Sequence, residues 1–104
     1  MYYIETDEGG VRGIEDVLAW AEWMETHDRA VALDTLGHCD VSTVFLGSDY
    51  RIGDGLPILY ETLVFGGPLD GEMERYCTRA EALEGHGRMV ERVQVEEREV
   101  RCEF

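Results

Sequence analysis

Histidine and cysteine are the side chains of this sequence that could do acid–base or metal chemistry. His86 lies in an apolar helical stripe, where a histidine could act as a general acid or base, but no Ser or Cys can be assigned to it as a nucleophile. A histidine in such a stripe is more often a partly buried packing residue with one hydrogen bond. The adjacent pair His38-Cys39 could begin a metal site with His27 or His86, although structural zinc sites usually contain closely spaced ligand pairs. The residues therefore predict no catalytic centre, no metal and no cofactor.

Four carboxylates in the middle of the chain could form an acid–base pair or bind a hard cation: Asp49, Asp54, Glu61 and Asp70. Their spacing lacks the dense oxygen ligands of a calcium-binding loop. Aspartate also forms turns, which explains such positions equally well. The glycine-rich segments at 53–55 and 66–67 lack the glycine and lysine pattern of a phosphate-binding loop, and the chain has no lysine. We therefore expect a protein that is not an enzyme.

Acidic side chains dominate the composition. Among 104 residues, 23 are Asp or Glu and 9 are basic, which gives a formal net charge of −14. A protein that binds nucleic acid directly needs a basic stripe, and this chain has none. It also has no apolar run of the roughly 20 residues that span a membrane and no signal-peptide pattern at its start. We therefore expect a cytoplasmic protein with reduced thiols.

The density of negative charge invites a comparison with DNA. A compact chain of this length would be about 33 Å across, and duplex DNA of that length carries about 19 phosphate charges. The net charge of −14 approaches this value, which is a necessary condition for mimicking DNA but not a sufficient one. The alternative is an acidic surface that only keeps the protein soluble.

Hydrophobic periodicity and turn residues predict an α+β fold. Strands are expected at residues 2–6, 30–35, 41–46, 57–65 and 72–77, and helices at 14–28 and 78–93. The short connections favour an antiparallel sheet of four or five strands with the two helices packed on one face. Residues 1–104 are expected to form a single domain. Residues 94–104 switch to a period of two, which predicts a C-terminal arm or edge strand in the same protomer or across a dimer.

The two predicted helices differ in their signals. The first has an apolar stripe, which consists of Ile14, Val17, Leu18, Ala21 and Met24. Trp23 lies nearly opposite this stripe, and an outward Trp is either buried under the C-terminal tail or serves as a contact anchor. The second helix begins at a capping box, with Thr78 as N-cap and Glu81 three residues later. Gly85 and Gly87 weaken that helix by roughly 1 kcal/mol each relative to Ala, or permit close packing on the sheet.

Several segments carry a resemblance to a known family. Residues 41–49 read VSTVFLGSD, residues 61–70 read ETLVFGGPLD, residues 75–78 read RYCT and residues 81–86 read EALEGH. With the helix at 18–25, they resemble small, mostly uncharacterised proteins of bacteriophages and prophages, over about residues 16–93. Members of that family often have Leu-Asp-His where this chain has Ser48-Asp49-Tyr50, and the tail after Val93 has no counterpart in them.

The resemblance implies a phage or mobile-element origin. Small acidic phage proteins without catalytic motifs often block host nucleic-acid machinery, and anti-CRISPR proteins are the leading example. We therefore expect an anti-CRISPR inhibitor in the cytoplasm of the infected bacterial host. Its partner would be a basic nucleic-acid-binding protein, a Cas subunit or effector complex, whose recognition of target DNA it blocks. The expected contact residues are Glu15, Glu22, Trp23, Glu25, Asp70, Glu72 and Glu74.

Two other functions remain open from the sequence. The chain could be a phage structural or housekeeping protein whose acidity serves solubility only, which predicts scattered charge. It could also be a small metal-binding protein or enzyme that uses His86 or His38-Cys39. A homodimer through the tail or an edge strand is compatible with all three functions.

Overall fold

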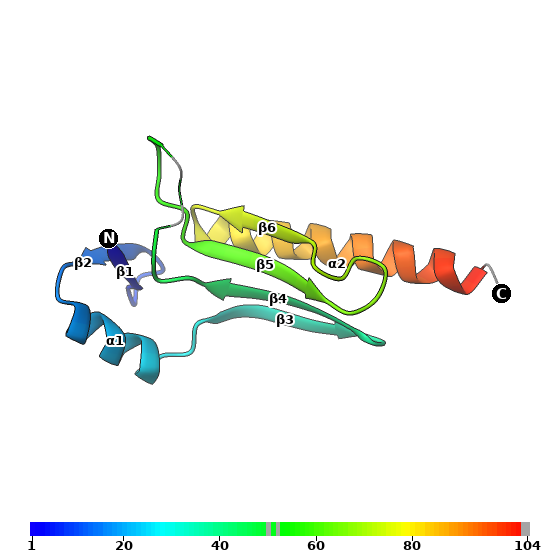
Figure 1. Cartoon of the computed structure of the whole chain (residues 1–104), viewed down its shortest axis with the longest axis horizontal. Coiled ribbons are helices and arrows are strands. Elements are labelled where there is room, and N and C mark those ends of the chain that lie inside the picture. Colours follow the sequence, from blue (N-terminus) through cyan, green and yellow to red (C-terminus); the bar gives the residue numbers. More distant parts are fainter. Residues whose placement is uncertain (50, 52, 103–104) are drawn as a thin grey trace.

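The computed structural model describes residues 1–49, 51 and 53–102, with side chains described up to residue 98 in the last helix. The element order is β1 (Tyr2–Glu5), β2 (Val11–Ile14), α1 (Val17–Thr26), β3 (Ala30–Leu36), β4 (Cys39–Phe45), β5 (Tyr60–Phe65), β6 (Met73–Tyr76) and α2 (Arg79–Cys102) (Figure 1). β1 and β2 form a two-stranded antiparallel sheet, and the other strands form a four-stranded antiparallel sheet in the order β3-β4-β5-β6. The predicted α+β class and four-stranded antiparallel sheet are confirmed.

Alternation along β4 and β5 gives the four-stranded sheet two different faces. Val41, Thr43 and Phe45 on β4 are buried, whereas the residues between them are partly exposed. Thr62 and Val64 on β5 are buried as well, and they pair across the strands with Thr43 and Val41. Successive side chains of a strand point to opposite faces. The buried face is therefore the one covered by α2, which contacts all four strands.

The start of α2 matches the capping box that the sequence predicts. The backbone N–H of Glu81 donates to the hydroxyl of Thr78 at 3.1 Å, and that hydroxyl donates to the Glu81 carboxylate at 3.0 Å. Gly85 permits close packing, because a Cβ there would lie 2.2 Å from the ring of Tyr76 on β6. Gly87 faces open space and has no such role.

The N-terminal part contains a strand that the sequence analysis missed. Residues 11–14 form β2 and pair with β1, so that Ile14 lies opposite Tyr2 instead of starting a helix. Gly9, at a φ of +86°, allows the tight hairpin turn between the two strands. α1 begins only at Val17, because Asp16 caps it by accepting hydrogen bonds from the backbone N–H groups of the next turn.

The orientation predicted for α1 is wrong in part, because Met24 of the predicted stripe packs against the core but Val17 and Leu18 do not. Leu18 of the predicted apolar stripe is 78% exposed, and the two tryptophans point inward instead. The indole N–H of Trp20 donates to the carbonyl of Gly47 at 3.1 Å. Large aromatic surfaces bury more area than Leu or Val and satisfy their polar atom at the same time, which decides the rotation. α1 contacts β1 and β2, so the packing of both helices on one face of the four-stranded sheet is not confirmed.

The predicted edge strand at residues 94–104 is wrong for residues 94–102, which continue α2; residues 103 and 104 lie outside the described residues. Val93 is buried, and Glu97, four residues later on the same side of the helix, accepts a hydrogen bond from Cys39 at 2.8 Å. The helix therefore continues along the sheet. It extends past the end of the sheet (Figure 1), and the molecule measures 55 × 30 × 22 Å. No helix among the described residues is both long and apolar enough to cross a bilayer.

Candidate functional site

Three of the predicted contact residues lie on α1 or just before it, and α1 also carries an exposed leucine. Leu18, Glu22 and Glu25 lie four and three residues apart, so they share one side of the helix. Glu15 directly precedes the N-cap, and all four side chains are exposed. None of the three glutamates makes an ion pair with another described residue. We call Glu15, Leu18, Glu22 and Glu25 the α1 acidic face.

Trp23 does not belong to this face. Its ring packs edge-on against Phe45 of β4, with a centroid distance of 5.7 Å, and stacks on His27 at 4.4 Å. The side chain is partly buried against the core at the N-terminal end of α2. The outward orientation predicted for Trp23 is therefore wrong, and the most exposed large apolar side chain of α1 is Leu18.

The second predicted acidic group lies at β6, and its carboxylates already have partners. Glu72 and Glu74 lie 3.5 and 3.4 Å from arginines of α2, Arg92 and Arg88. Asp70 accepts a hydrogen bond from the backbone N–H of Gly66 at 2.7 Å and so holds the turn before β6. These charges are partly neutralised or serve the fold, unlike those of the α1 acidic face.

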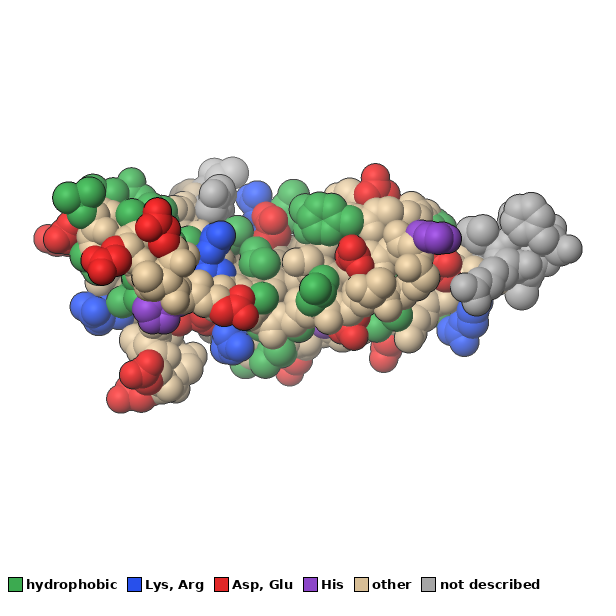
Figure 2. Space-filling view, turned by 90° about the horizontal axis from the view of Figure 1, so that it is seen from below, with side chains coloured by type: hydrophobic (Ala, Val, Ile, Leu, Met, Phe, Trp, Pro, Cys, Tyr) green, Lys and Arg blue, Asp and Glu red, His purple; other side chains and the backbone are tan. Residues whose placement is uncertain are grey.

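The structure does not bring the two acidic groups together. α1 lies beside the small β1–β2 sheet, whereas β6 is the outer strand at the far edge of the large sheet from β3 (Figure 1). In the view of Figure 2, acidic side chains are spread along the whole molecule and are separated by apolar and basic ones. That face therefore carries no continuous acidic area.

The elongated shape weakens the comparison with DNA. The molecule is 55 Å long, not about 33 Å. Duplex DNA of that length carries about 32 phosphate charges, against a net charge of −14 for the whole protein. Overall charge density alone therefore does not make this surface equivalent to DNA, and any mimicry has to come from a local group.

His86 lies in the middle of a buried chain of hydrogen bonds between α2 and the sheet. Its Nε2 lies 2.7 Å from Asp34 Oδ2, and its Nδ1 lies 2.7 Å from Thr43 Oγ1. The hydroxyl oxygens of Thr43 and Thr62 are 2.5 Å apart, and the Tyr76 hydroxyl donates to Thr62 at 3.0 Å. With the His86 proton on Nε2, each hydroxyl donates to the next group, and the imidazole donates to Asp34. Every polar side-chain atom of Tyr76, Thr62, Thr43 and His86 then has a hydrogen-bond partner.

The order Asp34, His86, Thr43 matches that of a hydrolase triad, but the position does not permit catalysis by it. Thr43 is 0% exposed and His86 is 6% exposed, so a substrate cannot reach the hydroxyl. The sequence predicts a packing histidine with one hydrogen bond, and the structure shows two. Thr43 shares a strand face with Val41 and Phe45, and a polar residue in such a row needs a buried partner. The polar Thr43 in this apolar row could have indicated a buried hydrogen-bond network, although not which residues form it.

The other residues considered for metal chemistry are also separated. The Cys39 thiol donates to Glu97, and this hydrogen bond together with burial raises the pKa of the thiol to about 11. The thiol therefore stays protonated at neutral pH. Neighbouring His38 is exposed at the β3–β4 turn. Within residues 1–49, 51 and 53–98, no three His, Cys, Asp or Glu side chains converge as metal ligands.

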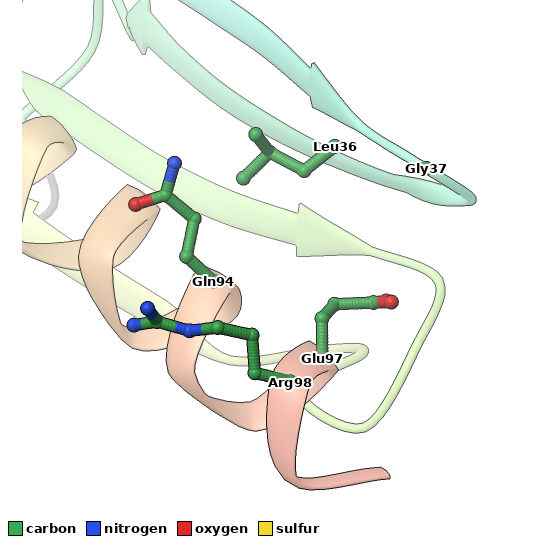
Figure 3. Close-up of a pocket in the computed structure, with 5 residues that line it drawn as sticks. All are labelled: Leu36, Gly37, Gln94, Glu97 and Arg98. Carbon is green, nitrogen blue, oxygen red and sulfur yellow. The ribbon is translucent and has the colours of Figure 1, made fainter. Parts of the chain in front are cut away.

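A pocket of about 400 Å³ lies between the β3–β4 turn and the C-terminal half of α2 (Figure 3). It is lined by Leu36, Gly37, Gln94, Glu97 and Arg98. The lining combines an apolar side chain, an amide and two opposite charges, and Glu97 is already hydrogen-bonded to Cys39. The pocket can hold a small polar group, but its lining supplies no nucleophile.

Three of the four mid-chain carboxylates, Asp49, Glu61 and Asp70, serve turns or strand pairing. Asp49 accepts hydrogen bonds from the backbone N–H groups of Arg51 and Ile58, at 3.0 and 3.1 Å, which is a turn-forming role. Glu61 on β5 pairs with Arg75 on β6 at 3.0 Å. A cation site is therefore not assembled from them.

Comparison of the chain with protein-family models, with curated proteins and with solved structures finds no match.

Proposed function

We propose that this protein is a non-enzymatic inhibitor that docks its α1 acidic face onto a basic nucleic-acid-binding protein. The leading partner class is a Cas subunit or effector complex in the cytoplasm of an infected bacterium, which the resemblance to phage proteins suggests. The observation that carries the proposal is the local arrangement at α1. Two exposed glutamates share the side of the helix with an exposed leucine, a third directly precedes the N-cap, and none of the three has an ion-pair partner among the described residues.

Electrostatics favours this face over the acidic group at β6. The glutamates at β6 face arginines of α2, and docking a basic groove there would require those ion pairs to be broken or shared. At α1 the carboxylates are free to meet arginine or lysine side chains directly. Opposite charges at the rim of an interface raise the association rate and make it sensitive to salt.

Leu18 supplies the apolar part of such an interface. With 78% of its surface exposed, it is the most exposed leucine among the described residues. An apolar side chain contributes most to binding when the contacts around it exclude water from it. Burial of this leucine would hold the complex after the charges have brought the partners together.

The test measures DNA binding by a purified Cascade-type effector complex in a gel-shift assay, with and without this protein. We expect the wild-type protein in tenfold excess to prevent the shift at about 50 mM salt and to do so less well at about 200 mM. The triple variant Glu15→Gln/Glu22→Gln/Glu25→Gln should lose at least tenfold in inhibition. Leu18→Ala should lose inhibition at both salt concentrations, since its contribution does not depend on charge.

A matched control separates a local site from total charge. The variant Asp7→Asn/Glu84→Gln/Glu91→Gln removes the same three charges from exposed positions outside the α1 acidic face. It should inhibit like the wild type. Equal losses for both triple variants would mean that only net charge matters, and unchanged DNA binding with wild-type protein would refute the proposal.

The second candidate is a phage structural or housekeeping protein whose acidity serves solubility. The spread of acidic side chains in Figure 2 favours it, because scattered charge keeps a protein soluble without forming a site. It predicts that both triple variants behave like the wild type toward every basic partner and differ from it only in solubility.

A further inference from the structure

We propose that the face of the four-stranded sheet that points away from α2 binds a second copy of this chain and forms a weak homodimer. We call this surface the open face. It is independent of the proposed function, because it uses neither the α1 acidic face nor a basic partner.

The open face carries several large apolar side chains where a solvent-facing sheet would be mostly polar. Leu33, Ser42, Leu63 and Met73 lie directly opposite one another on β3, β4, β5 and β6 and form one row across the sheet. Leu33 is 64% exposed and Met73 46% exposed, and Phe65 beside them is 50% exposed. An antiparallel sheet that faces water normally alternates apolar-in and polar-out. Leu63 lies opposite Met73 and two residues from Phe65 on the same face, and Leu33 lies beyond Ser42 on the outer strand. Large exposed apolar side chains grouped in this way on an outer sheet face indicate an interaction surface.

No described helix covers these side chains. α2 lies on the opposite face of the sheet, and α1 lies beside the β1–β2 sheet. The Trp23 ring reaches the large sheet at Phe45, which belongs to the α2 side. The view in Figure 2 shows apolar side chains at the surface in the middle of the molecule, between the acidic ones.

The charge on this face favours a second copy over a basic partner as the occupant. The protein carries −14, so two copies can approach only where their surfaces carry little net charge. On the open face, the described strands contribute Asp40, Glu61 and Arg75, and Glu61 is neutralised by Arg75 at 3.0 Å. Asp40 accepts a hydrogen bond from Thr35 on the same face at 2.7 Å. A basic partner would find almost no negative charge here, whereas a like-charged copy meets little repulsion.

The size of the face predicts a weak dimer. Four strands spaced about 4.8 Å apart, over about six residues each, give a flat footprint of about 400 Å² per protomer. Stable interfaces bury about 800 Å² per partner, so we expect a weak dimer whose population depends on protein concentration. Two such faces would pack about 10 Å apart, as the sheets of a β-sandwich do.

Sedimentation equilibrium of the full chain, from about 1 to 500 µM, tests the proposal. We expect the mass to rise from 11.8 kDa toward twice that value as the concentration increases. The variant Leu33→Asp/Phe65→Asp should remain monomeric throughout. Phe65→Thr/Met73→Thr, which keeps strand-forming residues and so guards against misfolding, should raise the dissociation constant at least tenfold.

The control changes exposed apolar residues on α2. Leu83 and Val95 are 48% and 42% exposed, and Leu83→Asp/Val95→Asp should dimerise like the wild type apart from the added repulsion. A wild-type mass that stays at 11.8 kDa up to 500 µM would overturn the proposal. So would an open-face variant that dimerises as well as the α2 control, because the interface would then lie elsewhere.

Salt separates this interaction from binding of a basic partner. Screening weakens the repulsion between two acidic copies, so the dimer should tighten as NaCl rises from about 50 to 500 mM. Docking of the α1 acidic face on a basic protein should weaken over the same range. A dimer that weakens with salt would contradict an apolar, charge-poor interface, whatever the outcome of the gel-shift assay.

Discussion

The Thr43 hydroxyl joins Thr62 to His86 in the buried row of hydrogen bonds. Replacing it tests how much these hydrogen bonds contribute to the stability of the fold. Thr43→Val keeps the shape of the side chain and removes only the hydroxyl. The donor of Thr62 and Nδ1 of His86 then both lose their partner. Both groups lie where water cannot reach, because Thr43 and Thr62 are 0% exposed and His86 is 6% exposed.

The expected cost follows from the burial of the orphaned groups. A buried donor or acceptor without a partner costs about 1–3 kcal/mol, and the more apolar valine offsets part of the sum, so Thr43→Val should destabilise by about 2–4 kcal/mol. Asp34→Ala cuts the same chain at its outer end, where the Asp34 side chain is 53% exposed. Water can replace that carboxylate, so this variant should cost about 1 kcal/mol or less.

Urea unfolding followed by circular dichroism, at one fixed protein concentration, measures these differences. Thr43→Ser is the matched variant, because it keeps the hydroxyl and removes one methyl group, at a cost of about 1 kcal/mol. The predicted order of stability places Thr43→Ser above Thr43→Val, with Asp34→Ala closest to the wild type. If Thr43→Val were as stable as Thr43→Ser, the hydroxyl would contribute nothing to stability. The hydrogen bonds of Thr43 would then not stabilise the contact between α2 and the sheet.

Two further predictions concern the packing of α2. Gly85→Ala should destabilise by about 2–4 kcal/mol, because the added Cβ would lie 2.2 Å from the Tyr76 ring. Gly87→Ala places its Cβ in open space and should stabilise by up to about 1 kcal/mol. Thermal unfolding compares the two variants, and equal effects would contradict the close contact at Gly85. The raised pKa of Cys39, about 11 against an ordinary value of 9.0, means that the unfolded chain loses the thiol proton first as pH rises. Stability should therefore fall between about pH 9 and 11, and the fall should be smaller in Cys39→Ala; an unchanged alkaline slope in that variant would show that the thiol is not responsible.

Local signals predicted the elements of the large sheet well. The alternation of residues 41–46 gave β4 its two faces, because the side-chain period of a strand is two whatever its neighbours are. The capping box at Thr78 and Glu81 predicted the start of α2 for a similar reason, since its hydrogen bonds join residues three apart in the chain.

Local signals failed where tertiary contacts compete with propensity. The apolar stripe of α1 predicted that Leu18 would be buried, but Trp20 and Trp23 found an N–H acceptor and an aromatic neighbour from distant segments. The period of two in residues 94–104 predicted a strand, but Glu97 meets Cys39 when α2 simply continues. In both cases the deciding partner lies far away in the chain, so no window of the sequence contains it.

The sequence by itself determined the α+β class, the antiparallel sheet, the start of α2 and the net charge of −14, because each follows from composition or from residues a few positions apart. Only the tertiary structure decided which charges are free. It paired Glu72 and Glu74 with arginines of α2 and left the glutamates at α1 without such partners among the described residues. It also joined His86 to Thr43 and Asp34 and left one sheet face open. The physical reason is the same throughout: the free energy of a charge or a polar group depends on the neighbours that folding brings to it, and those neighbours come from other parts of the chain.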